Sequence, residues 1–145
     1  TVLWYTKARK TKMYFTESLE IPNGTAEVPA MLWYASKQSL VVFALDKDRR
    51  PTEKTALFHA PFFNVYEDGH VCMGNVDVNI KNSASVEEFI QAWEHYCFNS
   101  YFSHSLCENL TKKNIVTLWK DLVHTNKPFP KEALKKNSKT LKNLL

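Results

Sequence analysis

Two apolar clusters stand out in the first third of the chain, with a short polar stretch between them. Residues 31–34 and 40–45 are apolar, and the polar run 36–39 connects them. Runs of this length, rich in aromatic and β-branched residues and joined by a polar connection, predict a β-hairpin. Shorter β-prone runs occur at residues 3–5, 13–15 and 55–59. We therefore expect the first half of the chain to form strands, with residues 46–54 as an exposed loop.

The second half of the chain shows helical spacing instead. Ser85 is followed three residues later by Glu88, which is the pattern of a capping box at a helix start. Behind it, one face of the predicted helix carries Val86, Phe89, Ile90, Trp93 and Cys97. A second helix is predicted from the apolar spacing of residues 115–122, ending before Pro128 and Pro130. Strands followed by helices predict an α+β domain: an antiparallel sheet of about four strands followed by two or three helices.

Length and composition favour one domain with a hydrophobic core. The chain has 145 residues, of which 44% are hydrophobic and 13% aromatic. We expect a domain over residues 1–125 and a basic C-terminal helix or tail over 126–145. No run of 18 apolar residues occurs, so no membrane span is expected, and no signal peptide is recognisable. A cytoplasmic location is the expectation.

The formal net charge of +4 is concentrated at one end of the sequence. Residues 126–145 contain six lysines and a single acid, Glu132, so the remainder of the chain is close to neutral. A solvated helix or frayed end accounts for such a segment without a ligand. On this reading nucleic acid is not an expected partner.

Three cysteines are present, an odd number without a C-x-x-C motif. The chain is not expected to be a disulfide scaffold, and the cysteines are expected to be reduced thiols. Cys97 lies on the apolar face of the first helix and is predicted to be a packed small hydrophobe. Cys107 is predicted to lie in a loop or at a helix edge. Cys72 follows the turn Asp68-Gly69, where a thiol is accessible.

A zinc site is the alternative for the histidines. His70 lies two residues before Cys72, and His104 lies three residues before Cys107. A tetrahedral site needs both pairs to meet in space, and nothing in the sequence brings them together. We therefore expect no metal and no cofactor, with His70 as a neighbour of the Cys72 thiol or a solvent-facing residue.

The segment from Pro61 to Met73 resembles the active-site segment of ubiquitin-conjugating enzymes. The residues at matching offsets are Asn64, Val65, Gly69, Val71, Cys72 and Met73. The resemblance implies that Cys72 carries a ubiquitin-like protein as a thioester, which an amine then attacks. It also implies that the Asn64 amide either stabilises the oxyanion or only holds the loop.

A closer resemblance is to protein B of the PRTRC cassette, a prokaryotic ubiquitin-conjugating-like family. It is carried by Phe58 to Tyr66, by the run Val71-Cys72-Met73-Gly74 and by Phe98 to His104. It implies a ThiF-like activating enzyme and a ubiquitin-like protein as partners, while the modified target is not indicated. The chain departs from the eukaryotic pattern, because Phe62-Phe63-Asn64 replaces the His-Pro-Asn triplet and Ile80 stands where a tryptophan is usual.

Three hypotheses about function follow. The first is a thioester carrier that uses Cys72, with Asn64 as polar support. The second is an inactive relative that binds a ubiquitin-like protein without accepting it, Cys72 being a core residue. The third is a plasmid-maintenance interaction protein whose lysine-rich tail binds DNA. Accessibility of the Cys72 thiol distinguishes the first hypothesis from the second.

Overall fold

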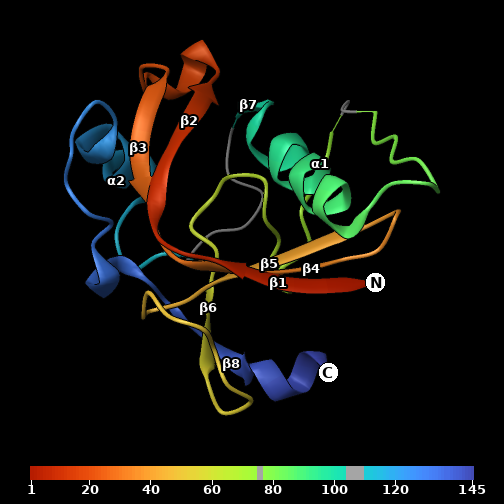
Figure 1. Ribbon diagram of the computed structural model, residues 1–145. Coiled ribbons are helices and arrows are strands. Elements are labelled where there is room, and N and C mark those ends of the chain that lie inside the picture. Colours follow the sequence, from red (N-terminus) through yellow and green to blue (C-terminus); the bar gives the residue numbers. More distant parts are fainter. Residues whose placement is uncertain (75–76, 104–109) are drawn as a thin grey trace.

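The described part of the chain forms two sheets and two α-helices (Figure 1). This computed structural model describes residues 1–74, 77–103 and 110–145. The main sheet has the strand order β1-β4-β5-β6-β8. Its strands are β1 (Val2–Thr6), β4 (Met31–Ala35), β5 (Leu40–Ala44), β6 (Ala56–His59) and β8 (Lys136–Thr140). A smaller sheet has the order β3-β2-β7, with β2 (Arg9–Phe15), β3 (Gly24–Val28) and β7 (Tyr101–Phe102).

The main sheet is antiparallel throughout, as the sequence predicted. The predicted hairpin is present: β4 pairs with β5 from Met31 opposite Ala44 to Ala35 opposite Leu40. The amide of Ser36 closes its turn by donating to the carbonyl oxygen of Ser39 at 3.0 Å. The sheet has five strands where about four were expected. The small sheet is mixed, because β2 pairs in parallel with β7 and antiparallel with β3.

Helix α1 (Val86–Phe98) begins at the predicted capping box, in which Ser85 accepts from the amide of Glu88 at 3.1 Å. Its Trp93 and Cys97 are buried, as the helical spacing predicted. Val86, predicted on the same apolar face, differs, since it is 57% exposed at the first position of the helix. Helix α2 (Ile115–Leu122) is capped by the Asn114 side chain and ends before the prolines.

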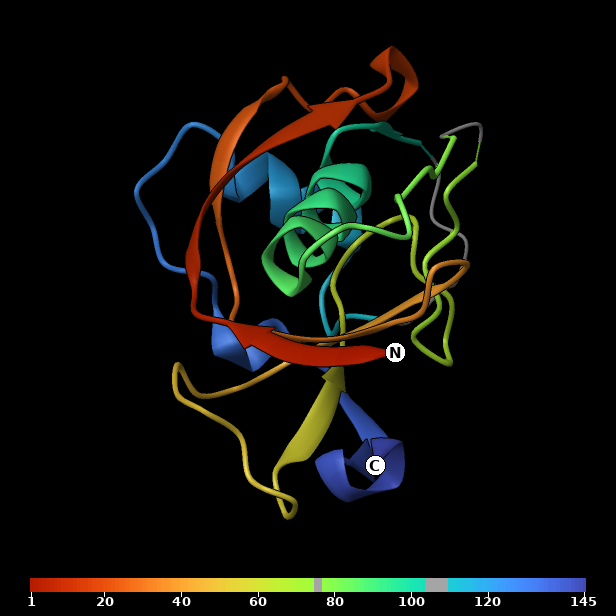
Figure 2. The same cartoon turned by 45° about the vertical axis from the view of Figure 1, so that its right-hand side comes forward.

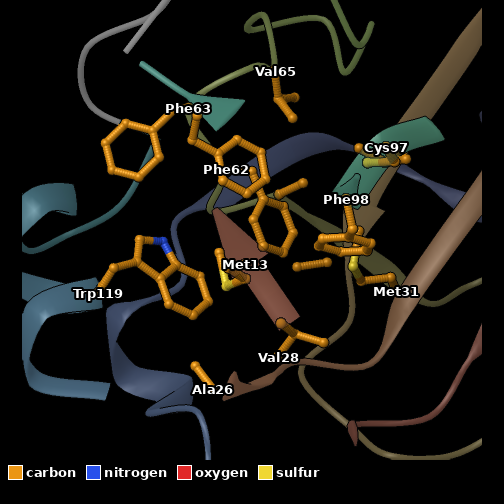
Figure 3. Close-up of a cluster of buried hydrophobic side chains, with 14 of the residues drawn as sticks. Met13, Ala26, Val28, Met31, Phe62, Phe63, Val65, Cys97, Phe98 and Trp119 are labelled. Atoms are coloured by element: carbon orange, nitrogen blue, oxygen red, sulfur yellow. The ribbon is translucent and has the colours of Figure 1, made fainter. Parts of the chain in front are cut away.

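Both helices cover one face of the main sheet, and β2 and β3 curve round the same side (Figure 2). The core between these layers is rich in aromatic rings (Figure 3). Phe62 stacks on Trp119 with ring centroids 5.6 Å apart, and the Trp119 indole N–H donates to the carbonyl oxygen of Pro61 at 2.8 Å. The segment that leads into the Asn64 to Cys72 region is therefore anchored in the core immediately before it.

The C-terminal segment differs from the expected basic helix or tail. Only Lys131–Ala133 and Leu141–Leu144 are helical, each as a short 3₁₀ turn, and Lys136–Thr140 is strand β8. Strand β8 pairs antiparallel with β6 at the edge of the main sheet. Lysines are frequent on edge strands because they prevent further pairing. Backbone pairing with β6 therefore forms a strand that the lysine-rich sequence does not indicate.

Buried leucines fasten this C-terminal segment to the rest of the fold. Leu134 is 1% exposed in the main core, and Leu141 is buried on the opposite face of the sheet. Leu141 packs there with Leu32, Phe43 and Leu57. The segment is thus part of the folded unit. Among the described helices, none has the length and apolar character needed to cross a membrane.

Substitution Leu134→Ala is expected to lower the free energy of unfolding by about 2–5 kcal/mol, since it leaves a cavity in a packed core. The matched control is Leu145→Ala in the same segment. Because Leu145 is 71% exposed, its loss should change the free energy by less than about 0.5 kcal/mol. Urea unfolding followed by tryptophan fluorescence measures both. Equal stability of the two variants would mean that residues 126–145 are not part of the folded unit.

Candidate active site

Residues 64–72 form a small hairpin whose two ends are Asn64 and Cys72. The amide of Cys72 donates to the carbonyl oxygen of Asn64 at 2.8 Å, and the amide of Tyr66 donates to His70 at 2.8 Å. Between these bonds, Val65 and Val71 form an antiparallel bridge. The eight-residue offset from Asn64 to Cys72 is therefore the spacing of two strand positions that face each other across a tight turn.

The tip of the hairpin is attached to strand β5. The carbonyl oxygen of Gly69 accepts from the amide of Val42 at 2.9 Å, and the amide of Val71 donates to Leu40 at 2.9 Å. Gly69 has a φ of +94°, and a Cβ atom built on it would lie 2.7 Å from Cζ of Phe43. Only glycine fits both this backbone conformation and this close approach. The predicted turn is present, and its glycine is required by the packing as well.

Asp68 stabilises the turn through its carboxylate. One oxygen accepts from the amide of His70 at 3.0 Å, and the other lies 3.0 Å from Nδ1 of the same residue. The hydrogen bond from the His70 amide is the main cause of a lowered pKa of Asp68; burial opposes it, and the His70 side chain and the nearby charge of Lys139 add to the lowering. The His70 ring is thus engaged by Asp68 at the exposed tip.

Cys72 lies at the end of the hairpin, outside any regular strand, and is half-buried. The Tyr66 phenol lies close enough to the Cys72 side chain for their interaction to be the main cause of a raised pKa of Tyr66. Tyr66 itself is 44% exposed. The thiol therefore lies at the protein surface beside a phenol that can donate to it.

Tyr66 is the residue at this site that sequence reasoning did not single out. The signal was available in the spacing, since the pairing of Val65 with Val71 makes Tyr66 and Cys72 diagonal neighbours on one side of the hairpin. A register for the hairpin was needed before that signal could be used. The turn at Asp68-Gly69 alone does not specify the register.

The side chain of Asn64 points to helix α1. Its Nδ2 donates to the carbonyl oxygen of Cys97 at 3.4 Å, and its Oδ1 is buried without a hydrogen-bond partner among the described residues. The link between Asn64 and Cys72 is the backbone hydrogen bond described above. In this arrangement the amide ties the first strand of the hairpin to the last turn of α1.

Cys97 has the opposite environment from Cys72. It is fully buried in the main core (Figure 3), and burial raises the pKa of its thiol to about 12, with the nearby Glu94 adding to the rise and the Asn64 hydrogen bond opposing it. A thiol in this environment stays protonated and out of contact with reagents. The prediction that Cys97 is a packed small hydrophobe is confirmed.

The histidines do not assemble a metal site in the part of the chain that the structure describes. Within residues 1–74, 77–103 and 110–145, no group of three or more His, Cys, Asp or Glu side chains could hold an ion. His104 and Cys107, the second half of the zinc alternative, lie outside the described residues.

Burial lowers the pKa of His59. The nearby Glu67 opposes this effect of burial, and the nearby Lys135 adds to it.

Alkylation should separate the two described thiols. We expect iodoacetamide to modify Cys72 in the native protein at about pH 7, because a half-buried surface thiol is accessible. Cys97 should stay unmodified even at about pH 9.5, since its pKa of about 12 keeps the folded-state thiol protonated. Peptide mapping by mass spectrometry assigns each adduct, and unfolding in urea should expose Cys97. Native modification of Cys97 at a rate similar to that of Cys72 would contradict the packing described here.

One comparison with known proteins identifies a family for this chain. The family model described as Prokaryotic E2 family D matches residues 1–137. Comparison with curated proteins and with solved structures gave no match. The matched region runs from β1 through both helices and into β8, and it includes the whole Asn64 to Cys72 hairpin. The resemblance to a prokaryotic ubiquitin-conjugating-like family is thereby confirmed, and the chain belongs to prokaryotic E2 family D.

Proposed function

We propose that this protein accepts a ubiquitin-like protein as a thioester on Cys72 and passes it to an amine. The observation that carries the proposal is the half-buried Cys72 thiol at the end of a hairpin that is attached to the main sheet. This thiol and hairpin belong to a ubiquitin-conjugating-like protein. A carrier needs a thiol that a large partner can reach and that the fold holds in a constant position. Cys97 fails the first need, since it is fully buried in the main core.

Two steps make up the reaction. In the first, the Cys72 thiolate attacks the carbonyl carbon of a thioester on the activating enzyme; a new C–S bond forms and the activating enzyme's thiolate leaves. In the second, an amine attacks the Cys72 thioester; a C–N bond forms, the C–S bond breaks and the amine loses a proton to solvent or a nearby base. The thioester supplies the driving force, so neither step requires a metal or other cofactor.

Tyr66 and Asn64 support Cys72 in different ways. The Tyr66 phenol interacts with the Cys72 side chain, so its hydroxyl can donate to the thiolate when that leaves during aminolysis. Asn64 acts as polar support: its backbone carbonyl holds Cys72 and its amide holds helix α1. In this proposal Asn64 is a positioning residue, since its amide already contacts the Cys97 carbonyl.

The partners follow from the resemblance to the PRTRC cassette. A ThiF-like enzyme would activate the C-terminal carboxyl of a ubiquitin-like protein with ATP, and this protein would receive it. The amine that finally accepts the ubiquitin-like protein belongs to a target still to be identified. The family membership supports an interaction with ubiquitin-like proteins in general.

The thioester can be tested with the ThiF-like enzyme, ATP and the ubiquitin-like protein. We expect wild type to form an adduct that dithiothreitol releases, and Cys72→Ala to form none. Cys72→Ser should form an oxyester that resists dithiothreitol and breaks in mild base. The matched control is Cys97→Ala, which removes the buried thiol and should charge at the wild-type level. Non-reducing gel electrophoresis and intact mass measure all four proteins.

Failure of this test would have a defined meaning. If the activating enzyme charges itself but wild type does not accept the ubiquitin-like protein, the proposed carrier function is wrong. The remaining hypothesis is then an inactive relative that binds the ubiquitin-like protein without accepting it. It predicts that wild type and Cys72→Ala bind the ubiquitin-like protein with equal affinity in calorimetry.

Asn64→Ala tests the positioning role. We expect it to lower the free energy of unfolding by about 1 kcal/mol, since the hydrogen bond to Cys97 is lost. Charging and discharge of Cys72 should slow by similar factors, because both steps use the same misplaced thiol. Single-turnover assays with free lysine as acceptor measure the two rates separately. A large loss of discharge alone, with unchanged stability and charging, would instead assign the Asn64 amide to the oxyanion.

A further inference from the structure

One side of the hairpin of residues 64–72 carries an imidazole as well as the Cys72 thiol. The amide of Tyr66 donates to the carbonyl oxygen of His70 at 2.8 Å, which sets these two residues opposite each other. Opposite residues of an antiparallel pair point to the same side, and so do residues two positions apart. His70 therefore shares a side with both Tyr66 and Cys72. The proximity of the Tyr66 phenol to the Cys72 side chain agrees with this register.

The carboxylate of Asp68 fixes the orientation of the His70 ring. Its Oδ2 lies 3.0 Å from Nδ1 of His70, and its Oδ1 accepts from the His70 amide at 3.0 Å. Because a carboxylate oxygen only accepts, the neutral imidazole carries its proton on Nδ1 and keeps the lone pair of Nε2. The side chain of His70 is 52% exposed. An incoming molecule can therefore reach the basic nitrogen.

The surroundings of the ring leave Asp68 as its charged neighbour. In the described part of the chain, the one ion pair of His70 is with Asp68. Strand β5 places the apolar side chain of Val41 opposite His70. Lys139 of β8 acts on the carboxylate of Asp68, and the carboxylate of Glu67, also in the turn, is exposed to solvent.

Closure of the turn explains only one of the two contacts that Asp68 makes. Its hydrogen bond to the backbone amide of His70 would form with almost any residue at that position. The contact with Nδ1 requires a side chain that presents a donor there. A carboxylate that orients an imidazole beside a nucleophile is the arrangement in which a histidine acts as a general base.

We propose that His70 is the general base that takes a proton from the amine attacking the Cys72 thioester, and that Asp68 positions it. The inference rests on the proposed function and names the base for its second step. In an extended chain, residues two positions apart are separated by about 7 Å. This spacing leaves room for an amine nitrogen between the imidazole and the thioester carbon. A base needs a distance of about 2.6–3.2 Å to the atom that gives up the proton.

The proton and the electron pairs balance within this step. The amine nitrogen forms a C–N bond to the thioester carbonyl carbon, and one of its protons moves to Nε2 of His70. The C–S bond breaks, and its electron pair leaves on the Cys72 sulfur. The carboxylate of Asp68 stabilises the imidazolium through Nδ1–H. The imidazolium then gives its proton to the thiolate or to solvent, which restores the starting state.

The test uses Cys72 that has been acylated directly, without the activating enzyme or the ubiquitin-like protein. A short peptide thioester of a small thiol exchanges onto Cys72, and free lysine then serves as the acceptor. Peptide mapping by mass spectrometry follows the acyl group on Cys72. His70→Asn keeps a side-chain N–H for Asp68 but has no basic nitrogen. We expect it to take up the acyl group like wild type and to lose it to lysine about 100-fold more slowly.

Two further variants and a pH series separate a base from a structural residue. His95→Asn is the matched control, since it removes an exposed imidazole from α1 and should change the rate less than about twofold. Asp68→Asn should slow aminolysis about tenfold, because an amide N–H facing Nδ1 moves the imidazole proton to Nε2. The ratio of the wild-type rate to the His70→Asn rate should fall toward one between about pH 8 and pH 5.5, because a protonated imidazole accepts no proton. This ratio cancels the titration of the lysine acceptor.

Several results would overturn the proposal. These are equal aminolysis by wild type and His70→Asn, equal losses in His70→Asn and His95→Asn, or a rate ratio that does not change with pH. Equal slowing of acyl uptake and aminolysis in His70→Asn would assign the residue to placement of the thiol instead. Failure of enzymatic charging would refute the proposed function alone, since the direct acylation assay still decides the role of His70. Circular dichroism verifies that each variant is folded.

Discussion

The close approach of Gly69 to the Phe43 ring is the contact on which the candidate site depends. A side chain at this position would collide with the ring, and the positive φ of Gly69 excludes most other residues as well. Because this contact lets the turn lie directly on β5, the backbone of the hairpin can form its bonds to Leu40 and Val42. Cys72 is thereby held by the main sheet although it belongs to no regular strand.

The two described cysteines show how environment decides the chemistry of one residue type. Cys97 is surrounded by the main core, where the charged form of a thiol is strongly disfavoured, and its pKa rises to about 12. Cys72 is half-buried at the surface and has a phenol hydroxyl beside it. Asn64 connects the two environments, since its backbone binds Cys72 and its side chain binds the carbonyl of Cys97. Packing of α1 against the sheet and placement of Cys72 are therefore linked through one residue.

The C-terminal segment contributes both buried and exposed side chains to the fold. Leu134 and Leu141 flank strand β8 and pack in the cores on opposite faces of the main sheet, while Lys136 and Lys142 are exposed. Two neighbouring backbone hydrogen bonds hold the end of the segment, since the amide of Leu141 donates to Thr55 and the amide of Lys142 donates to Glu53 in the loop between β5 and β6.

Local patterns in the sequence determined the α+β class, the β4–β5 hairpin, the start of α1 and the turn before Cys72. Each of these depends on interactions within a few residues: alternation of apolar positions, a capping box, or a glycine turn. Resemblance to the ubiquitin-conjugating enzymes added Cys72 and Asn64. Tertiary structure decided the rest. It made a strand of Lys136–Thr140 through pairing with β6, brought Tyr66 to Cys72 through the hairpin register, and turned the Asn64 amide to Cys97. These outcomes depend on partners distant in the sequence or on a register that no local pattern specifies, and only the folded chain brings them together.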